Sequence, residues 1–322
     1  MRIFKRKLYD KLLEWKNNRH GKTAVLIEGA RRVGKSTLTK QFAENEYESY
    51  VMIDFSIVRD DVLELFNHID DLDYFFLQLQ FRLGVSLKER KSLVIFDEVQ
   101  KCPKARQAIK HLVADGRYDY IETGSLISIK KNVKDILIPS EEEKLFLYPM
   151  DYEEFKWALG DNTAIPQLRM LFDKKLSIGD AVTRKLMRDF RIYMVVGGMP
   201  QAVDTYIDTN NLMEVDRVKR NIIQLYEDDF YKIDSSGRLS MLFDAIPAQL
   251  NSNASRYQVA SAIGNNTDSE KVLQLISELR ESMTINMAYH ANDPGVGMSL
   301  VMNLNKYKMY IGDTGLFITL AF

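Results

Sequence analysis

The chain has 322 residues, of which 46% are hydrophobic and 28% charged, a composition typical of a globular protein with two or three domains and unlike that of fibres or small disulfide scaffolds. Its 44 basic and 45 acidic side chains give a net charge of −1, so no overall field draws the molecule onto DNA or an anionic membrane. The lone cysteine, the charged N-terminal segment and the lack of a long apolar run lead us to expect a cytoplasmic protein with no membrane partner.

Positive charge is concentrated in residues 1–40. This segment holds twelve Lys and Arg side chains against three acidic ones, a net charge of +9, which leaves −10 for the rest of the chain. Within it, residues 24–29 (AVLIEG) are typical of a short buried strand, and residues 36–44 have a helical pattern. Between them the sequence GARRVGKST contains the pattern G-x-x-x-x-G-K-S, which predicts a phosphate-binding loop.

Each residue type in this loop has a chemical reason. Gly29 and Gly34 let the backbone curl with its N–H groups inward, and the following helix adds the positive end of its dipole. Lys35 is expected to place its charge between the β- and γ-phosphates, and Ser36 to offer a hydroxyl to Mg²⁺. We expect ATP with Mg²⁺ as the ligand; the alternative is a glycine turn before an ordinary helix. The expected nucleotide-binding residues are Gly29, Ala30, Arg31, Arg32, Val33, Gly34, Lys35, Ser36 and Thr37.

An acidic pair follows the second strongly apolar run. Residues 93–96 are uninterruptedly apolar, as in a strand buried on both faces of a parallel sheet, and Asp97 and Glu98 follow. Open α/β sheets bind their ligands at this end of the strands. We expect Asp97 to hold Mg²⁺, and Glu98 to orient and deprotonate the attacking water. Such a pair is often only a solvated strand end, but the upstream GKS favours the catalytic interpretation.

Three further strands complete an α/β fold with a parallel sheet. Residues 50–55 and 118–125 have strand composition, and residues 143–150 are a plausible fifth strand. Thr123 and Ser125 end one of these strands, where a hydroxyl could sense the γ-phosphate or simply cap a turn. After the fifth strand, Asp151 and Glu154 have the spacing of a helix capping box.

Several segments together resemble a known family. GARRVGKST, SLVIFDEVQ, ETGSL, LYPMDYEEF and VVGGMP resemble the bacterial and archaeal AAA-type ATPases that carry a C-terminal domain of unknown function related to restriction endonucleases. The resemblance covers nearly the whole chain. It implies a P-loop NTPase sheet of order 5-1-4-3-2, then a helical lid, a winged helix and a nuclease-like region. The corresponding ranges are residues 1–160, 161–235, 236–305 and 306–322.

The same resemblance suggests a second set of nucleotide contacts. Residues 195–203, VVGGMPQAV, are similar to a glycine-proline motif that related signalling ATPases place against the adenine and ribose. Gly198 and Pro200 would then bind the nucleotide. The alternative is a helix break made by Gly197, Gly198 and Pro200, which needs no ligand.

An arginine finger, if the protein uses one, has several candidates. Residues 180–193 have a helical pattern in which Arg184, Arg188 and Arg191 share one face. A solvated face is the ordinary explanation of such a row. One of these residues or Arg220 is a candidate finger, which in an oligomer would reach a neighbouring site.

The C-terminal third has the pattern of a helix-turn-helix followed by two strands. Residues 251–282 suggest two helices, with Ser255 capping the first, and residues 283–290 and 298–305 suggest the strands of a wing. DNA-binding modules usually have a basic footprint, whereas residues 251–282 have a net charge of −1. We favour an intramolecular or protein-contact role and keep DNA as the alternative partner.

The last residues, 308–322 (KMYIGDTGLFITLAF), read as strand-like and apolar. In the resembling family a similar D-T-G-L segment opens the nuclease-like domain, so Asp313 to Leu316 imply that the chain stops inside that domain. The later acidic positions of that fold have no counterpart here. Asp313 alone cannot hold a catalytic metal.

We therefore expect an ATP- and ADP-binding, Mg²⁺-dependent ATPase whose nucleotide state repositions the lid and winged helix, with a protein partner or a second copy as possible contacts. The alternative is a nucleotide-dependent switch or DNA-binding regulator with negligible turnover. A small-molecule kinase could use the same loop, but Glu98 directly after Asp97 favours water as the acceptor.

Overall fold

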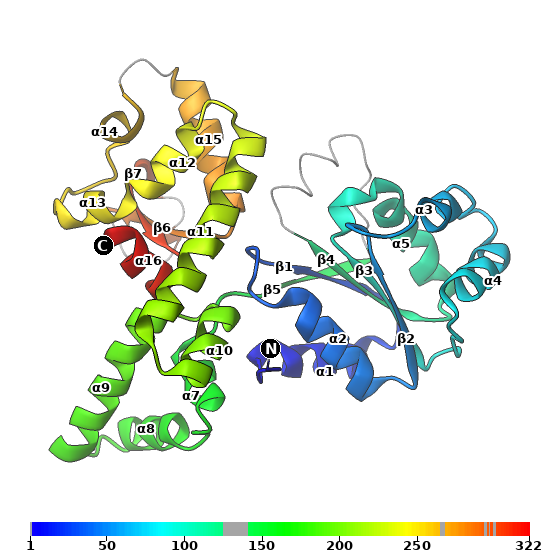
Figure 1. Ribbon diagram of the computed structural model, residues 1–322, viewed down its shortest axis with the longest axis horizontal. Helices are drawn as coiled ribbons and strands as arrows, with labels where there is room; N and C mark the ends of the chain where they lie inside the picture. Colours follow the sequence, from blue (N-terminus) through cyan, green and yellow to red (C-terminus); the bar gives the residue numbers. More distant parts are fainter. Residues whose placement is uncertain (1, 125–140, 265–267, 293–294, 296, 299–300) are drawn as a thin grey trace. The chain divides into compact units, whose positions relative to one another are not determined.

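The computed structural model describes residues 2–124, 141–264, 268–292, 295, 297–298 and 301–322 (Figure 1). The chain divides into two compact units. We call Lys5–Leu147 the N-terminal unit, and Met1–Phe4 with Tyr148–Phe322 the C-terminal unit. Among the described residues, no helix combines the length and the apolarity that a membrane span requires.

The N-terminal unit is built on a five-stranded sheet in which every pair is parallel. Its order is β2-β3-β4-β1-β5, so the predicted fold class and the order 5-1-4-3-2 are confirmed. The three inner strands β1, β3 and β4 are buried along their whole length, as expected of parallel strands covered on both faces. The strands are β1 (Ala24–Glu28), β2 (Ser49–Asp54), β3 (Ser92–Asp97), β4 (Asp119–Gly124) and β5 (Glu142–Phe146).

Helices cover this sheet. Side chains of alternate residues on the inner strands, such as Leu26, Phe96 and Tyr120, form the main apolar core with α3, α4 and α5. Helix α2 directly follows β1, and α1 packs against α2. The helices are α1 (Lys7–Arg19), α2 (Lys35–Glu46), α3 (Asp60–Leu65), α4 (Leu72–Leu83), the short 3₁₀ segment η1 (Val99–Lys101) and α5 (Pro103–Asp115).

Among its described residues, the C-terminal unit is mostly helical, and β6 and β7 form an antiparallel pair. The capping box expected at Asp151 and Glu154 is present at the start of α7. Its elements are α7 (Tyr152–Ala158), α8 (Ala164–Asp173), α9 (Asp180–Val196), α10 (Pro200–Thr209), α11 (Leu212–Ile233), α12 (Arg238–Asp244), α13 (Ile246–Asn251), α14 (Val259–Ile263), α15 (Ser269–Glu281), β6 (Ile285–Ala291), β7 (Met302–Ile311) and α16 (Thr314–Ala321).

The helix expected to start after Ser255 begins later. Helix α14 starts at Val259, and Ser255 does not cap it. Tyr257 explains the delay, because its N–H donates to the Tyr307 carbonyl at 2.7 Å and its hydroxyl to the Leu242 carbonyl at 2.7 Å. These contacts to β7 and α12 hold the backbone extended where local pattern favoured a helix.

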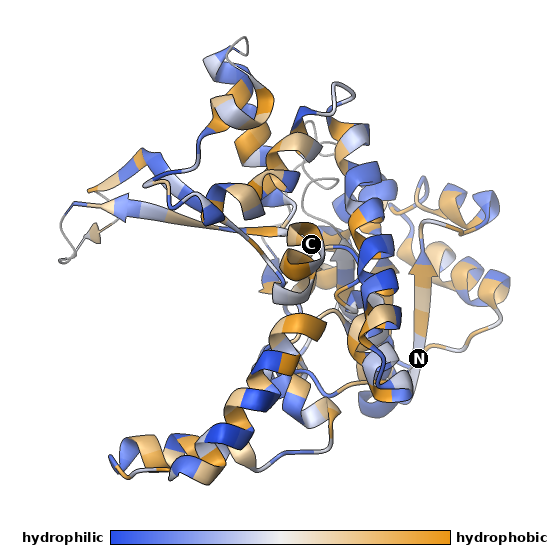
Figure 2. Ribbon diagram, turned by 60° about the vertical axis from the view of Figure 1, so that its left-hand side comes forward, coloured by the Kyte–Doolittle hydropathy of each residue, from blue (hydrophilic) through white to orange (hydrophobic). Residues whose placement is uncertain are grey.

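The end of the chain also differs from expectation. The strand-like interpretation of the last residues is wrong, because Thr314–Ala321 form the apolar helix α16 (Figure 2). A short apolar helix and a buried strand can both read as continuous apolar runs, so periodicity cannot separate them. The domain boundary expected at residue 305 falls inside β7, and α16 packs against α9 and α11.

Candidate functional site

The predicted phosphate-binding loop joins β1 to α2, and its backbone explains both glycines. Gly34 precedes α2 with φ of +97°, a conformation that side chains disfavour. At Gly29 an added Cβ would lie 2.3 Å from the Leu147 carbonyl oxygen, so only glycine fits against the end of the sheet. No side chain caps α2, so the first N–H groups of this helix are available to an anion.

Lys35 lies along this loop. Its side chain is buried, and its Nζ donates to the carbonyl oxygens of Gly29 at 2.9 Å and Ala30 at 3.1 Å. Burial lowers the pKa of Lys35, while the negative charges of Glu98 and Asp97 act in the opposite direction. The ammonium group is therefore held beside the loop and close to both acidic residues.

Asp97 connects the loop to two strands. This buried carboxylate ends β3. Its Oδ1 accepts two hydrogen bonds, from the Ser36 hydroxyl at 2.9 Å and from the Thr123 hydroxyl at the end of β4. Burial raises the pKa of Asp97, and the two hydroxyl donors partly offset that rise. The structure thus brings together residues that are 26 to 61 positions apart in the sequence.

Glu98 lies beside this group in a turn. Glu98 has a positive φ of 55° and directly precedes the 3₁₀ segment η1. Its N–H donates to the Thr123 hydroxyl at 3.3 Å. The side-chain amide of the buried Gln100 donates to the Glu98 carboxylate. Thr123 therefore contacts both acidic residues, which explains a hydroxyl at this strand end.

The donor set fits magnesium. A serine hydroxyl and a carboxylate are hard oxygen donors, and Mg²⁺ is typically held by one or two protein groups together with phosphate and water oxygens. Ser36 and Asp97 are therefore the residues that would hold the ion. The chemistry of these donors, like the uncapped start of α2, suits a magnesium-bound polyphosphate.

The other predicted loop residues have mixed surroundings. Ala30 and Val33 are buried, Arg31 and Arg32 are exposed, and Thr37 is intermediate. Arg32 has a positive φ of 69°, which places a second unusual conformation in the loop. The candidate Ser125 lies outside the described residues.

Sequence reasoning missed two residues next to this site, Arg6 and Gln100. Arg6 is buried and donates through Nη1 to the Val33 carbonyl at 2.8 Å. Gln100 had been included only as part of a motif, although it contacts Glu98. Neither residue carries a spacing signal, because Arg6 comes from a helix start 27 residues before the loop position it contacts.

Gly198 and Pro200 belong to the C-terminal unit. Gly198 lies between α9 and α10 and donates its N–H to Asp313 Oδ2 at 2.5 Å. An added Cβ on Gly198 would lie 2.0 Å from the Met150 carbonyl oxygen, and Gly197 has φ of +81°. These contacts account for the glycines as a packed helix break. A nucleotide contact by Gly198 and Pro200 stays a prediction.

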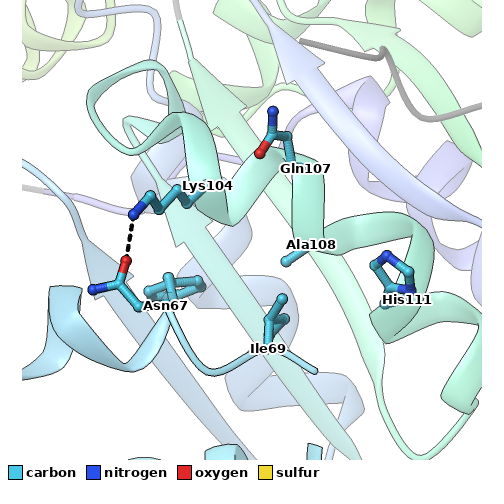
Figure 3. A pocket seen from close by; sticks show the side chains of 7 residues that line it. Asn67, Ile69, Lys104, Gln107, Ala108 and His111 are labelled. Carbon is cyan, nitrogen blue, oxygen red and sulfur yellow. Dashed lines mark hydrogen bonds between the residues drawn. The ribbon is translucent and has the colours of Figure 1, made fainter. Parts of the chain in front are cut away.

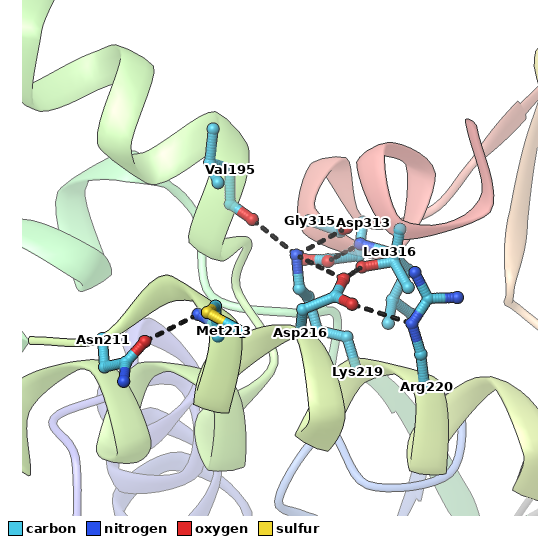
Figure 4. Close-up of polar contacts among 10 residues, drawn as sticks. Val195, Asn211, Met213, Asp216, Lys219, Arg220, Asp313, Gly315 and Leu316 are labelled. Carbon is cyan, nitrogen blue, oxygen red and sulfur yellow. Dashed lines mark hydrogen bonds and ion pairs between the residues drawn. The ribbon is translucent and has the colours of Figure 1, made fainter. Parts of the chain in front are cut away.

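Asp313, at the start of α16, and Lys219 of α11 hold this segment by hydrogen bonds, and Figure 4 shows Lys219 with its partners Val195 and Gly315. Asp313 caps α16 by accepting the Leu316 N–H at 2.8 Å, and burial raises its pKa. The Lys219 Nζ of α11 donates to the carbonyls of Val195 at 2.8 Å and Gly315 at 3.2 Å. The D-T-G-L segment therefore has a packing role within the C-terminal unit.

None of the arginine-finger candidates is buried. Arg184, Arg188 and Arg191 are exposed on α9. Arg220 pairs with Asp216 on the same helix, with 2.7 Å between Nε and Oδ2 (Figure 4). The identity of a finger stays a prediction.

The N-terminal unit also has a surface pocket of about 550 Å³. It lies between the segment after α3 and one face of α5, and the Lys104 amine donates to the Asn67 side chain across it (Figure 3). No predicted site residue lines this pocket. Its lining consists of Phe66, Asn67, Ile69, Lys104, Gln107, Ala108 and His111.

Comparisons with known proteins divide the chain in a similar way. Residues 21–156 match the family model of an AAA domain, and residues 187–322 match a domain of unknown function, DUF8612. No curated protein matches the chain.

Among solved structures, the Walker-type ATPase PABY2304 of Pyrococcus abyssi is similar with a TM-score of 0.57 and 16% identity, over 99% of this chain and 96% of that one. The DNA-bound ORC1 protein of Aeropyrum pernix has a TM-score of 0.36 and 10% identity, over 99% and 93%. AMPPCP-bound DnaA from Aquifex aeolicus has a TM-score of 0.38 and 11% identity, over 86% of this chain and 88% of that one. The sheet order and the match of residues 21–156 support an AAA-type P-loop fold for this part of the chain, and residues 187–322 match a domain of unknown function.

Proposed function

We propose that the protein binds ATP with Mg²⁺ and hydrolyses it to ADP and phosphate. The observation that carries this proposal is the 2.9 Å hydrogen bond between the Ser36 hydroxyl and Asp97. It joins the two motifs found in the sequence at one point of the sheet. A polyphosphate-binding loop and an acidic pair can act on the same magnesium-bound phosphate only if their side chains lie within hydrogen-bonding distance of each other.

Each residue then has a distinct role. Loop N–H groups and the Lys35 charge bind the β- and γ-phosphates, while Ser36 and Asp97 hold the magnesium ion. The ion would neutralise charge that develops on the phosphate oxygens. Glu98 orients a water molecule and accepts its proton as the oxygen attacks the γ-phosphorus and the bond to the β–γ bridging oxygen breaks. Thr123, which donates to Asp97 and accepts from the Glu98 N–H, ties the Asp97 carboxylate to the backbone of Glu98.

The C-terminal unit would respond to the nucleotide. Our proposal retains residues 161–235 as a helical lid in which Gly198 and Pro200 report nucleotide state, and residues 236–305 as a winged helix. The order of α12 to α15 followed by the β6–β7 pair supports that assignment. The weak acidity of residues 251–282 favours a protein contact, either within the chain or with a partner, over DNA.

Two substitutions test the proposal. Lys35→Ala should abolish detectable binding of a fluorescent ATP analogue, because it removes the charge that the loop holds. Glu98→Gln should retain binding but lower the single-turnover hydrolysis rate by about 10² to 10⁴, the usual contribution of a general base. Lys40→Ala is the matched control, since Lys40 lies on the same helix α2 but is exposed.

Different results would locate the error. ATP binding by Lys35→Ala equal to that of the wild type would remove the loop from the proposal. Hydrolysis by Glu98→Gln at the wild-type rate would show that another group accepts the proton. Transfer of the γ-phosphate to a metabolite instead of water would convert the proposal into a kinase.

A further inference from the structure

Arg6 begins the helix that packs against the phosphate-binding helix. It is the residue directly before α1, whose apolar face (Leu8, Leu12 and Trp15) is buried. Helix α1 is fixed to α2 by the Tyr9 hydroxyl, which donates to Glu46 at 2.7 Å. The backbone of Arg6 is therefore anchored to the same helix that follows the loop.

The Arg6 side chain contacts the loop itself. It is only 5% exposed, and its Nη1 donates to the carbonyl oxygen of Val33, also buried, at 2.8 Å. The peptide that joins Val33 to Gly34 is trans. In a trans peptide the C=O and N–H bonds point in opposite directions. A guanidinium that holds the Val33 carbonyl therefore directs the Gly34 N–H to the opposite side of the peptide plane.

This peptide needs an external anchor. Gly34 has φ of +97° and no side chain that could resist rotation of the preceding peptide. Ordering such a residue costs conformational entropy, and an anion that had to order it on binding would lose affinity by the same amount. A buried charge-assisted hydrogen bond can order it beforehand, and the guanidinium also polarises the peptide so that its N–H becomes a stronger donor.

We propose that Arg6 is a positioning residue for the phosphate-binding loop: it fixes the Val33–Gly34 peptide from behind, so that the Gly34 N–H is ready for a phosphate oxygen. Arg6 does not contact the nucleotide in this proposal. The effect on nucleotide affinity rests on the proposed nucleotide binding. The ordering of the Val33–Gly34 peptide by Arg6 concerns the loop alone.

The experiment compares Arg6→Met, Arg6→Lys and the control Arg19→Gln in the full chain. Arg19 is at the other end of α1, about half exposed, and pairs with Glu143. Titration with MgATP and MgADP should show affinity about tenfold to a hundredfold weaker in Arg6→Met, the range expected for one charged hydrogen bond. Arg6→Lys should recover part of the loss, and Arg19→Gln should bind as the wild type does.

Amide hydrogen exchange without nucleotide separates this proposal from the previous one. Residues 30–36 should exchange faster in Arg6→Met than in the wild type or Arg19→Gln, whether or not ATP is the ligand. Thermal unfolding shows whether each variant folds. If Arg6→Met does not fold, the same exchange and titration measurements are made on Arg6→Lys. Unchanged loop exchange in a folded Arg6 variant would overturn the positioning role, as would wild-type nucleotide affinity. Wild-type protein that binds no nucleotide would instead refute the proposed function.

Discussion

Asp97 shows how a functional residue can act against stability. It ends a buried strand with its carboxylate almost removed from water, and burial raises its pKa although Ser36 and Thr123 donate hydrogen bonds to it. A carboxyl group whose pKa is higher in the folded state stabilises the fold only at low pH, and this contribution is lost as the pH rises through the folded pKa. At neutral pH the Asp97 charge therefore costs folding free energy.

We predict that Asp97→Asn raises the unfolding temperature of the nucleotide-free protein at pH 7.5 and weakens Mg²⁺-dependent ATP binding. The amide keeps an acceptor for the two hydroxyls but carries no charge to bury. The stability difference between variant and wild type should shrink as the pH falls through the raised folded pKa of Asp97 toward about 4, where an ordinary aspartate is half protonated. Thermal scans across this pH range measure it. The exposed Asp173→Asn is the control, and a less stable Asp97→Asn at pH 7.5 would contradict the argument.

At the scale of elements, a buried charge cluster joins α5 to two strands. Arg106 Nη1 lies 2.9 Å from Glu142 of β5 and 3.2 Å from Glu122 of β4, and all three side chains are buried. Strand β1 runs between β4 and β5, with Ala24 beside Glu142. The guanidinium thus connects two strands across a third. Burial raises the pKa of Glu122, and the second carboxylate adds to this effect, while Arg106 opposes it.

We predict that Arg106→Met lowers the free energy of unfolding by about 3 to 5 kcal/mol at pH 8, because it leaves two buried carboxylates without a cation. The loss should be smaller at pH 5, where a carboxyl group of raised pKa takes up a proton. Urea denaturation at both pH values measures the effect. Glu122→Gln is the informative comparison: it removes one of two like charges and should cost far less. A loss below about 1 kcal/mol in Arg106→Met would mean that water reaches the cluster.

Secondary structure was predictable where the signal was local. The strands before and after the loop and the capping box of Asp151 and Glu154 follow from residue pattern, and the structure has them. Helix α16 and the late start of α14 did not follow. Both depend on partners far along the chain: α16 on α9 and α11, and Tyr257 on Tyr307.

The whole molecule consists of two units, and the predicted nucleotide-binding loop and the acidic pair lie in one of them. Positive charge is concentrated in residues 1–40, which hold a net +9 in a chain of net −1, and all of these residues except the first four belong to the N-terminal unit. This local field would attract the anionic nucleotide of our proposal, while the overall charge offers no such attraction to DNA. Ligand binding should therefore be visible as a response that begins in the N-terminal unit.

We predict that MgATP at about 100 times its dissociation constant stabilises the binding unit by about 2.7 kcal/mol, because the ligand binds only the folded state. Hydrogen exchange should show added protection in peptides from residues 5–147. A change in peptides from residues 148–322 would support the proposed response of the lid. Lys35→Ala should abolish both effects. Protection confined to residues 148–322 would place the nucleotide elsewhere.

The sequence by itself determined the fold class, the strand order through a resemblance, and the loop with its acidic partner, because these depend on short runs whose chemistry permits few alternatives. Only the tertiary structure revealed the Arg6 contact with Val33, the Gln100 contact with Glu98, and the packing of Asp313 against Gly198. Two of these three join residues that are 27 and 115 positions apart. No periodicity or spacing rule encodes such pairs, since they arise when whole helices pack and bring their ends together.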